Sequence, residues 1–247
     1  VKNIMKKNHD LKNLINNKTN LNLNFEKIVF KKFRQGKVNK SFLFHDDNKE
    51  KKYILRINSN KSNLFNINRK HEALILKSVG KVGIAPKIIF SDPNYNFLIT
   101  EFLEGSFFSK DKVTKNDLDL MYQLINKYQK INIDLPKFNY FDHIKKYEKV
   151  ILDRLKITIS LRKRLDNFYP LLEDFQNQDW SPVLCHHDLS TSNIIRTSEG
   201  IKIIDWEFAG NGFANFDYHS VGLSESNKFL EDLINILSHL WDLIYKN

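Results

Sequence analysis

The sequence predicts an α+β fold built as two lobes, the first rich in strands and the second rich in helices. Two patterns carry this prediction. Short β-branched or aromatic runs separated by turn residues fill residues 25–102, and apolar residues at helical spacing dominate residues 103–247. The 247 residues are 41% hydrophobic, which is enough to bury a large core, and a cleft between two lobes is a natural ligand site.

The first lobe, at 25–102, follows a short N-terminal extension. Residues 4–16 have Ile and Leu at helical spacing, so we expect a helical extension within 1–24. A second helix is expected over 66–79, ended by Gly80. Turn signals such as Gly36 and Asp46-Asp47-Asn48 separate runs that predict strands. These runs are 25–33, 41–45, 51–57, 86–90 and 96–102.

The second lobe, at 103–247, is expected to contain four long helices and three short buried strands around a loop. The helices are predicted at 114–131, 140–155, 159–177 and 226–245. The strands are predicted at 183–184, 193–196 and 201–204.

Composition excludes several classes of protein. Cys185 is the only cysteine, which excludes an intrachain disulfide framework and a cysteine zinc cluster and fits a reducing cytoplasm. We expect no membrane-spanning helix and no secretion signal, because no long uncharged apolar run is present and residues 1–24 have no apolar h-region. The net charge of +10 is spread along the whole chain and indicates a solvated basic surface rather than a nucleic-acid patch.

The most informative stretch is C-H-H-D-L-S-T-S-N-I-I at 185–195, which has the pattern H-x-D-x-x-x-x-N before a hydrophobic run. Twelve residues after Asn193, Asp205 ends another hydrophobic run. Phosphoryl transfer from ATP needs a carboxylate near the acceptor hydroxyl and oxygen ligands for Mg²⁺. Asp188 suits the first requirement, and the oxygens of Asn193 and Asp205 suit the second.

A purely structural interpretation of this stretch is a capping Asp and a turn Asn beside a buried, hydrogen-bonded His186. Each half of the pattern alone fits that interpretation. The two halves together, in this order, favour catalysis.

These residues resemble the kinase-like fold of choline/ethanolamine kinases and the related aminoglycoside phosphotransferases. The resemblance covers residues 25–245 and includes motifs in both lobes. The second lobe contributes S-P-V-L-C-H-H-D at 181–188, I-D-W-E-F at 204–208, F-D at 216–217 and S-H-L-W at 238–241. The first lobe contributes N-K-S at 39–41, Y-I-L-R-I at 53–57, I-N-R at 67–69 and Glu72, in family order.

The resemblance implies a protein-kinase-like arrangement in which an antiparallel sheet lobe binds the nucleotide and a helical lobe carries the catalytic loop and the acceptor pocket. By this resemblance, Asp188 is the catalytic base, and Asn193 and Asp205 bind the metal. Arg56 stands where such folds usually have a strand lysine that contacts ATP phosphates and pairs with a helix glutamate, here Glu72.

The resemblance also implies the other contacts of the nucleotide. The phosphate loop at 34–40 has a single glycine, so it must rely on three polar residues, Asn39, Lys40 and Ser41. Where the lobes join, the backbone of Glu101, Phe102 and Leu103 would bind adenine. The implied cofactors are ATP and Mg²⁺.

A quaternary ammonium cannot donate a hydrogen bond, so aromatic faces and carboxylates must hold it. The expected acceptor pocket consists of Glu207, Phe208, Phe213, Asp217 and Trp241. Each aromatic residue could instead belong to the core, and Asp217 could instead brace the catalytic loop.

The predicted function is ATP-dependent phosphorylation of the hydroxyl of choline or ethanolamine in the cytoplasm. A kinase for thiamine or an aminoglycoside is the alternative within the same class. A pseudokinase binding module and a basic nucleic-acid-binding protein are the alternatives outside it, and the complete Asp188, Asn193 and Asp205 set argues against the former. The sequence leaves open the choice between choline and ethanolamine, and the oligomeric state.

Overall fold

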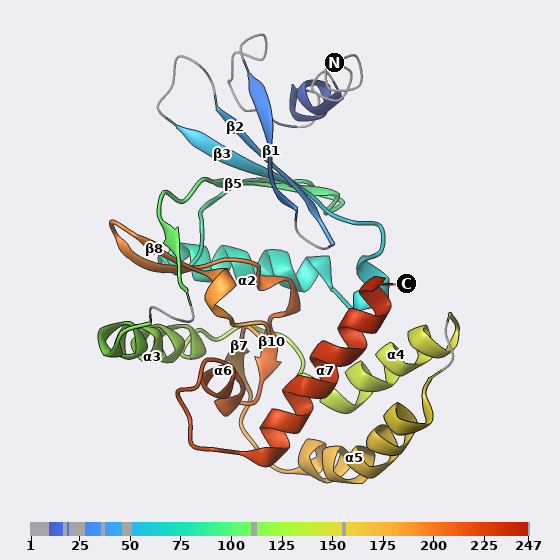
Figure 1. Cartoon of the computed structure of the whole chain (residues 1–247). Helices are drawn as coiled ribbons and strands as arrows, with labels where there is room; N and C mark the ends of the chain where they lie inside the picture. The colour runs from blue at the N-terminus through green and yellow to red at the C-terminus, as the bar shows by residue number, and fades with distance from the viewer. Residues whose placement is uncertain are drawn as a thin grey trace.

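The computed structural model describes residues 10–16, 19, 28–35, 38–45, 51–109, 113–154 and 157–246. It has the two lobes that the sequence predicts, a sheet lobe at the top of Figure 1 and a helical lobe below it. Residues 10–16 are helical, as expected, and they bury Leu11 and Ile15 against the sheet. Except for Thr19, the rest of the predicted extension at 1–24 lies outside the described residues.

The first lobe is a five-stranded antiparallel sheet in the order β1-β2-β3-β5-β4. Its register places Arg56 opposite both Ser41 and Leu98. Because side chains alternate between the two faces of a strand, these residues share the face that looks toward the second lobe. Phenylalanines and branched residues at intervening positions form the core on the other face. The strands are β1 (Val29–Gln35), β2 (Lys40–His45), β3 (Lys52–Ile57), β4 (Ile88–Ser91) and β5 (Phe97–Glu101).

Helix α2 (Arg69–Lys81) follows a 3₁₀ turn, η1 (Ser62–Phe65). It begins three residues later than the spacing predicts, because the Asn68 side chain caps it by accepting hydrogen bonds from the amides of Lys70 and His71. It also continues through Gly80 to Lys81, so the prediction that Gly80 ends the helix is wrong. The late start places Arg69 and Glu72 on the first turn, beside the cleft between the lobes.

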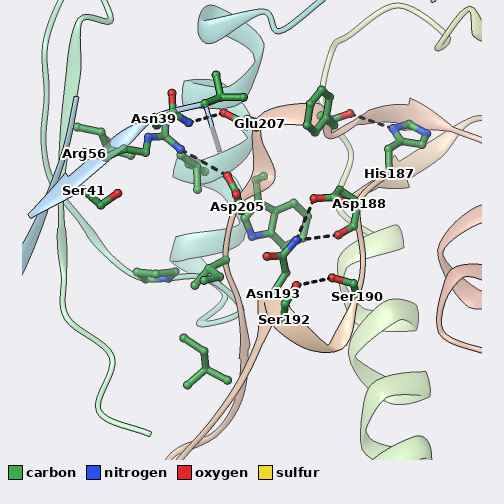
Figure 2. A pocket seen from close by; sticks show the side chains of 18 of the residues that line it. Asn39, Ser41, Arg56, His187, Asp188, Ser190, Ser192, Asn193, Asp205 and Glu207 are labelled. Carbon is green, nitrogen blue, oxygen red and sulfur yellow. Dashed lines mark hydrogen bonds and ion pairs between the residues drawn. The ribbon is translucent and has the colours of Figure 1, made fainter. Parts of the chain in front are cut away.

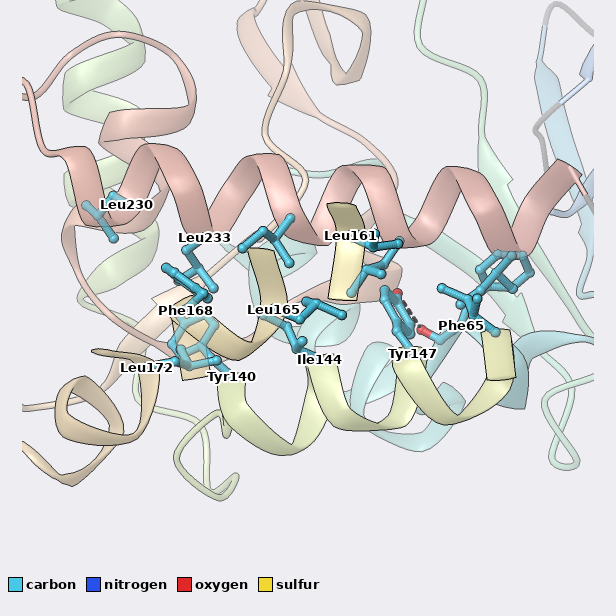
Figure 3. Close-up of a cluster of buried hydrophobic side chains, with 14 of the residues drawn as sticks. Phe65, Tyr140, Ile144, Tyr147, Leu161, Leu165, Phe168, Leu172, Leu230 and Leu233 are labelled. Carbon is cyan, nitrogen blue, oxygen red and sulfur yellow. Dashed lines mark hydrogen bonds between the residues drawn. The ribbon is translucent and has the colours of Figure 1, made fainter. Parts of the chain in front are cut away.

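Four long helices build the second lobe, within a few residues of their predicted bounds: α3 (Lys115–Gln129), α4 (Tyr140–Leu152), α5 (Ile159–Asn177) and α7 (Lys228–Lys246). Helices α4, α5 and α7 enclose a core that includes Ile144, Leu165 and Leu233 (Figure 3). This core fixes α4 and α7 as the two sides of one groove. In the described ranges, no helix has the length and hydropathy needed to cross a membrane.

Two small sheets hold the loop between residues 186 and 193. One pairs β7 (Val183–Cys185) with β10 (Gly210–Gly212), and the other has the order β6-β8-β9, with β6 (Ser106–Phe107), β8 (Ile194–Thr197) and β9 (Gly200–Ile203). The strands β6 and β10 and the short helix α6 (Asn215–Ser220) are additions to the predicted elements. Segments this short contain too few residues to establish a periodic pattern.

Candidate active site

A cleft of about 1010 Å³ lies between the lobes. The sheet face that carries Ser41 and Arg56 forms one wall, and the catalytic loop and the segment after β9 form the opposite wall (Figure 2). Helices α4 and α7 extend the cleft into the second lobe. The cleft therefore has a part shared by both lobes and a part walled by the helical lobe.

Asp188 lies on the loop between β7 and β8, where it is exposed and lines the cleft. The amide nitrogen of Asn193 donates hydrogen bonds to the Asp188 backbone oxygen at 2.9 Å and to its Oδ2 at 3.0 Å (Figure 2). These bonds orient the carboxylate and occupy the nitrogen of the Asn193 side chain, so its amide oxygen can serve another partner. Asp188 and Asn193, which belong to one sequence motif, are therefore in contact.

Asp217 braces this loop from behind. Its fully buried carboxylate accepts hydrogen bonds from the backbone amides of His186 at 2.6 Å and His187 at 3.0 Å, and from the hydroxyl of Tyr128 at 2.6 Å. Burial raises the pKa of Asp217, and these donors and His186 oppose the rise. Asp217 does not line the cleft, so its expected place in the acceptor pocket is wrong and its alternative role as a brace fits the geometry.

His186 is a second support of the loop. The Asp188 amide donates to His186 Nδ1 at 3.3 Å, so the proton of the neutral ring is on Nε2, which donates to the Ile204 carbonyl at 2.9 Å. Burial lowers the pKa of His186, which favours this neutral form. His186 thus ties the loop that carries Asp188 to the segment that carries Asp205.

Asp205 follows β9 in a left-handed backbone conformation, with φ 66°. Only a few per cent of non-glycine residues have positive φ, and Asp is one of the residues that tolerate it. The side chain is 42% exposed and lies 3.9 Å from the Arg56 guanidinium. Partial withdrawal from solvent and the neighbouring carboxylates of Glu207 and Asp188 raise the pKa of Asp205, against the effect of Arg56. Such a site favours a bound cation.

The predicted pair of Arg56 and Glu72 is present. Arg56 reaches from β3 to Glu72 on α2 with 2.6 Å between Nη2 and Oε1. Burial alone would raise the pKa of Glu72, but Arg56 and Arg69 together hold it below its ordinary value. Arg56 is therefore a fixed cation at the roof of the cleft, held by Glu72 and directed toward Asp205.

Glu207 differs from its expected role. It lines the cleft, but its Oε2 is bound by the Arg69 guanidinium at 2.9 Å and by the Asn39 amide at 2.7 Å. A carboxylate with two such partners is already compensated, so it is a poor site for a substrate ammonium. Sequence reasoning placed Arg69 in the family motif without assigning it a role. Its spacing of three residues before Glu72 on a helix was the available signal.

The phosphate loop contributes less than expected. Asn39 and Ser41 line the cleft, whereas Lys40 is exposed and lies outside its wall. Strand alternation explains the difference, since β2 begins at Lys40 and consecutive side chains point to opposite faces. Contrary to the expectation from the sequence, Lys40 therefore does not share the cleft wall with Asn39 and Ser41.

Glu101, Phe102 and Leu103 line the cleft where the lobes join. The amides of Glu101 and Phe102 donate to the carbonyls of Lys87 and Lys52, at 3.0 Å each, so they belong to the sheet. In an extended chain, the carbonyl of Glu101 and the amide of Leu103 point the same way. In that geometry, the Glu101 carbonyl and the Leu103 amide can meet the same purine edge.

The part of the cleft in the helical lobe is walled by rings. Trp241 and Phe208 line it as expected, but Phe213 does not, because its ring packs in the core against Phe175 and Trp180. The sequence reasoning missed most of the wall. The missed residues that line it are Phe138, Tyr140, His143, Tyr147, His187, Leu237, Ser238 and Asp242.

A signal for part of this wall was present in the sequence. Tyr140, His143 and Tyr147 have the spacing i, i+3 and i+7, which places them on one face of α4. His187 accepts a hydrogen bond from the hydroxyl of Tyr140 at 2.9 Å and donates one to the Phe208 carbonyl at 3.1 Å.

Both histidines of this wall are uncharged. Burial lowers the pKa of His143 to about 3 and that of His187 to about 3. Asn66 donates a hydrogen bond to His143 Nδ1 at 3.0 Å, which also fits a neutral ring. The wall thus adds no positive charge that would repel a cationic acceptor.

The charges around the cleft fit a divalent cation. Arg56 and Arg69 compensate Glu72 and Glu207. The carboxylates of Asp188 and Asp205 line the part of the cleft shared by both lobes and add negative charge there. The described part of the chain has no cluster of three or more His, Cys, Asp or Glu that could hold a metal by itself. Asn193 and Asp205 offer hard oxygens that suit Mg²⁺ shared with phosphate groups.

Solved structures establish the class of fold. The choline kinase LicA from Streptococcus pneumoniae matches with a TM-score of 0.74 and 19% identity, covering 96% of this chain and 90% of that one. The ethanolamine kinase of Plasmodium vivax matches with a TM-score of 0.68 and 21% identity, covering 95% and 77%. The macrolide 2'-phosphotransferase MphH from Brachybacterium faecium matches with a TM-score of 0.57 and 14% identity, covering 94% and 82%. The fold is that of two-lobed small-molecule kinases.

The family follows from the sequence. The choline/ethanolamine kinase family model matches residues 30–225, and the chain belongs to this family, as its motifs predicted. Protein LicA of Haemophilus influenzae is 24% identical over 176 residues, which is 69% of this chain and 65% of that protein. Ethanolamine kinase 2 of Mus musculus is 25% identical over 203 residues, which is 78% of this chain and 52% of that protein. The chain thus spans between half and two thirds of the length of these relatives.

Proposed function

We propose that the protein transfers the terminal phosphoryl group of ATP to the hydroxyl of choline or ethanolamine, giving ADP and phosphocholine or phosphoethanolamine. One observation carries the proposal: Asp188, Asn193 and Asp205 face a single cleft that continues into a ring-lined groove. The first feature suits phosphoryl transfer, and the second suits an organic cation. Family membership agrees with both.

The nucleotide occupies the part of the cleft shared by the lobes. Adenine lies against the Glu101 carbonyl and the Leu103 amide, and Arg56 binds the phosphates through its guanidinium. Ser41 and Asn39 lie on the same side of the cleft as Arg56. One similar structure is that of LicA in complex with AMP. Because the reaction consumes ATP, we place it in the cytoplasm.

Asp188 is the catalytic base. The acceptor oxygen attacks the γ-phosphorus, the bond from that phosphorus to the β–γ bridging oxygen breaks, and ADP leaves. The hydroxyl proton passes to the carboxylate of Asp188, which Asn193 holds toward the cleft. Bound Mg²⁺, held by Asn193 and Asp205, would supply neutralisation of the phosphate charge.

The acceptor occupies the ring-lined groove, with its hydroxyl toward Asp188. Trp241, Tyr147 and Phe138 offer aromatic faces to the ammonium group. Asp242 lies beside Trp241 on the same wall and adds negative charge. An aminoglycoside carries several ammonium groups and would need more uncompensated carboxylates than this wall offers, since Glu207 is already paired.

The test is a panel of hydroxyl acceptors with MgATP, read as ADP formation. The panel contains choline, ethanolamine, thiamine and an aminoglycoside, and the Asp188→Asn variant provides the background rate. We expect acceptor-dependent ADP formation with choline or ethanolamine that chelation of Mg²⁺ abolishes. Faster turnover of thiamine or the aminoglycoside, or ADP formation equal to the background with both amino alcohols, would refute the proposal.

A further inference from the structure

Arg69 joins four side chains from four segments of the chain. Its Nη1 lies 2.8 Å from Glu72 Oε2 and 2.9 Å from Glu207 Oε2. Its Nη2 donates hydrogen bonds to Asn39 Oδ1 at 2.8 Å and to Ser62 Oγ at 3.0 Å. The guanidinium fork is the only side-chain group with enough fixed donors to serve several acceptors in one plane.

The cluster spans both lobes. Asn39 belongs to the phosphate loop of the sheet lobe, and Glu207 belongs to the helical lobe, two residues after Asp205. The two are also in direct contact, because Asn39 Nδ2 donates to Glu207 Oε2 at 2.7 Å (Figure 2). The side chains of Arg69, Glu72 and Glu207 are at most 10% exposed. A buried ionic cluster is costly to form unless every charge is paired, so its geometry is sharply defined.

Arg69 and Arg56 both bind the carboxylate of Glu72, each through a different oxygen. Arg56 binds Oε1 of Glu72, whereas Arg69 binds Oε2. With both oxygens occupied, the Glu72 carboxylate cannot rotate without breaking an ion pair. The position of Arg56, and hence of the cation facing the phosphates, therefore depends on Arg69 as well as on Glu72.

We propose that Arg69 is a positioning residue that latches the two lobes together through Asn39 and Glu207, and so sets the distance between Arg56 and Asp205. The latch acts on the nucleotide end of the cleft and leaves the ring-lined groove untouched. Its kinetic effect rests on the proposed function, but its effect on nucleotide binding does not. Glu207 accordingly serves the latch rather than the acceptor cation.

A double-mutant cycle tests the latch. Asn39→Ala, Glu207→Gln and the double variant are compared by kcat/KM for MgATP, by the acceptor KM and by calorimetric binding of ADP. We expect each single variant to lower kcat/KM for MgATP by about 10- to 100-fold, because misplaced catalytic groups cost this much. The double variant should lose no more than the worse single variant, because the parts of one latch are not additive. The acceptor KM should stay nearly constant.

Variants of Arg69 keep the test decisive. Arg69→Lys retains the charge but not the fork, and it should reproduce the loss in kcat/KM for MgATP with little change in melting temperature. Arg69→Met should lower kcat/KM for MgATP further than Arg69→Lys does. Arg164→Gln, which removes a surface arginine 3.9 Å from Asp232, is the control and should match the native protein.

Additive losses in the cycle, native kinetics in Arg69→Lys, or equal losses toward both substrates would overturn the latch. A native protein that turns over no acceptor would refute the proposed function alone. In that case, the ADP affinities of the same variants still decide the latch: they should fall non-additively if it exists, and unchanged affinities would reject it.

Discussion

The carboxylate of Asp188 accepts a hydrogen bond from the side chain of Asn193 and lines the cleft. Asp188→Asn keeps the shape and the hydrogen bond from Asn193 but removes the proton acceptor. We expect acceptor-dependent ADP formation to fall by about 10²- to 10⁴-fold, the usual contribution of a general base, while ADP binding measured by calorimetry stays nearly unchanged. The matched control is Asp134→Asn at an exposed position outside the cleft. Near-native turnover in Asp188→Asn would show that Asp188 is not the general base.

Trp241 is one of the residues expected in the acceptor pocket that line the cleft. Its indole packs against the rings of Phe65 and Tyr245, with centroids 5.3 and 5.4 Å away. An indole face contributes about 0.5–2 kcal/mol to binding a cation, so Trp241→Ala should raise the acceptor KM by roughly 2- to 30-fold and leave the ATP KM unchanged. Tyr122→Ala, an exposed aromatic residue outside the cleft, is the control.

A core role for Trp241 predicts a different result. Loss of packing between α7 and η1 would lower the melting temperature and raise both KM values alike. Measuring the two constants and a melting curve on the same variant separates these outcomes.

At the residue scale, linear motifs were predictable and spatial ones were not. Asp188 and Asn193 lie on one loop, and Asp205 follows the end of a nearby strand. Their short spacing in the sequence was therefore enough to predict that they lie close together. Glu207 and Asp217 lie on the same segment, and spacing cannot show whether a carboxylate meets a substrate, an arginine or a backbone amide. Their partners come from elsewhere in the chain, Arg69 on α2 for Glu207 and Tyr128 on α3 for Asp217.

At the element scale, β10 supports the catalytic loop through a glycine. A Cβ at Gly212 would lie 2.2 Å from His187 Nε2 and 2.6 Å from the hydroxyl of Tyr140, and neither ring can move freely in its packed surroundings. The backbone of β10 thus approaches the bonded Tyr140 and His187 pair as closely as a glycine allows. A residue with a side chain must separate that pair.

Gly212→Ala should therefore destabilise the fold and disturb the loop that carries Asp188. Overpacking of a dense site costs about 1–3 kcal/mol, so we expect a loss of that size in the free energy of unfolding and a fall in kcat. Gly80→Ala is the control. Gly80 lies within α2, and a Cβ there would meet only the Pro86 carbonyl, at 3.6 Å. Alanine favours a helix over glycine, so this control should be neutral or stabilising. Equal stability of the two variants would contradict the tight approach.

The long elements were predictable from periodicity, and the short ones were not. Helix α5 has its predicted bounds, and α3 and α7 lie within two residues of theirs. The start of α2 depends on the capping side chain of Asn68, which periodicity does not register. Strand β6 exists only through its partner β8, and β10 only through β7, so their formation depends on contacts distant in the sequence.

At the scale of the whole molecule, the chain has a large net positive charge, whereas its buried charged groups near the cleft are paired. The net charge of +10 lies on a chain whose buried cleft cluster pairs each glutamate with an arginine. Buried histidines are kept neutral in the same region. Groups near the cleft therefore contribute to the response of the fold to acidification, and the direction of their contribution follows from their pKa values.

The histidines predict a loss of stability as the pH falls. His143 has an ordinary pKa of 6.5 in the unfolded chain and a pKa of about 3 in the folded protein, where burial, His187 and Lys146 all oppose protonation. Below pH 6.5 the unfolded chain binds a proton that the folded protein does not, so stability decreases as the pH falls toward 3. Each such group contributes a slope of about 1.4 kcal/mol per pH unit. His187 acts in the same direction, whereas the raised pKa values of Asp205 and Asp217 act in the opposite direction.

Groups with opposing effects titrate over the same pH range. A variant that lacks one titrating group therefore shows the contribution of that group more clearly than the pH dependence of the native protein's stability does. His143→Gln keeps an acceptor for Asn66 and cannot be protonated. Its free energy of unfolding, measured by denaturant titration, should lie below that of the native protein at pH 7, and the gap should shrink by about 2 kcal/mol between pH 6 and pH 4.5. His239→Gln on the exposed side of α7 is the control. A gap that stays constant over this pH range would show that His143 takes up its proton equally in both states, and that it is not the buried neutral ring that the groove requires.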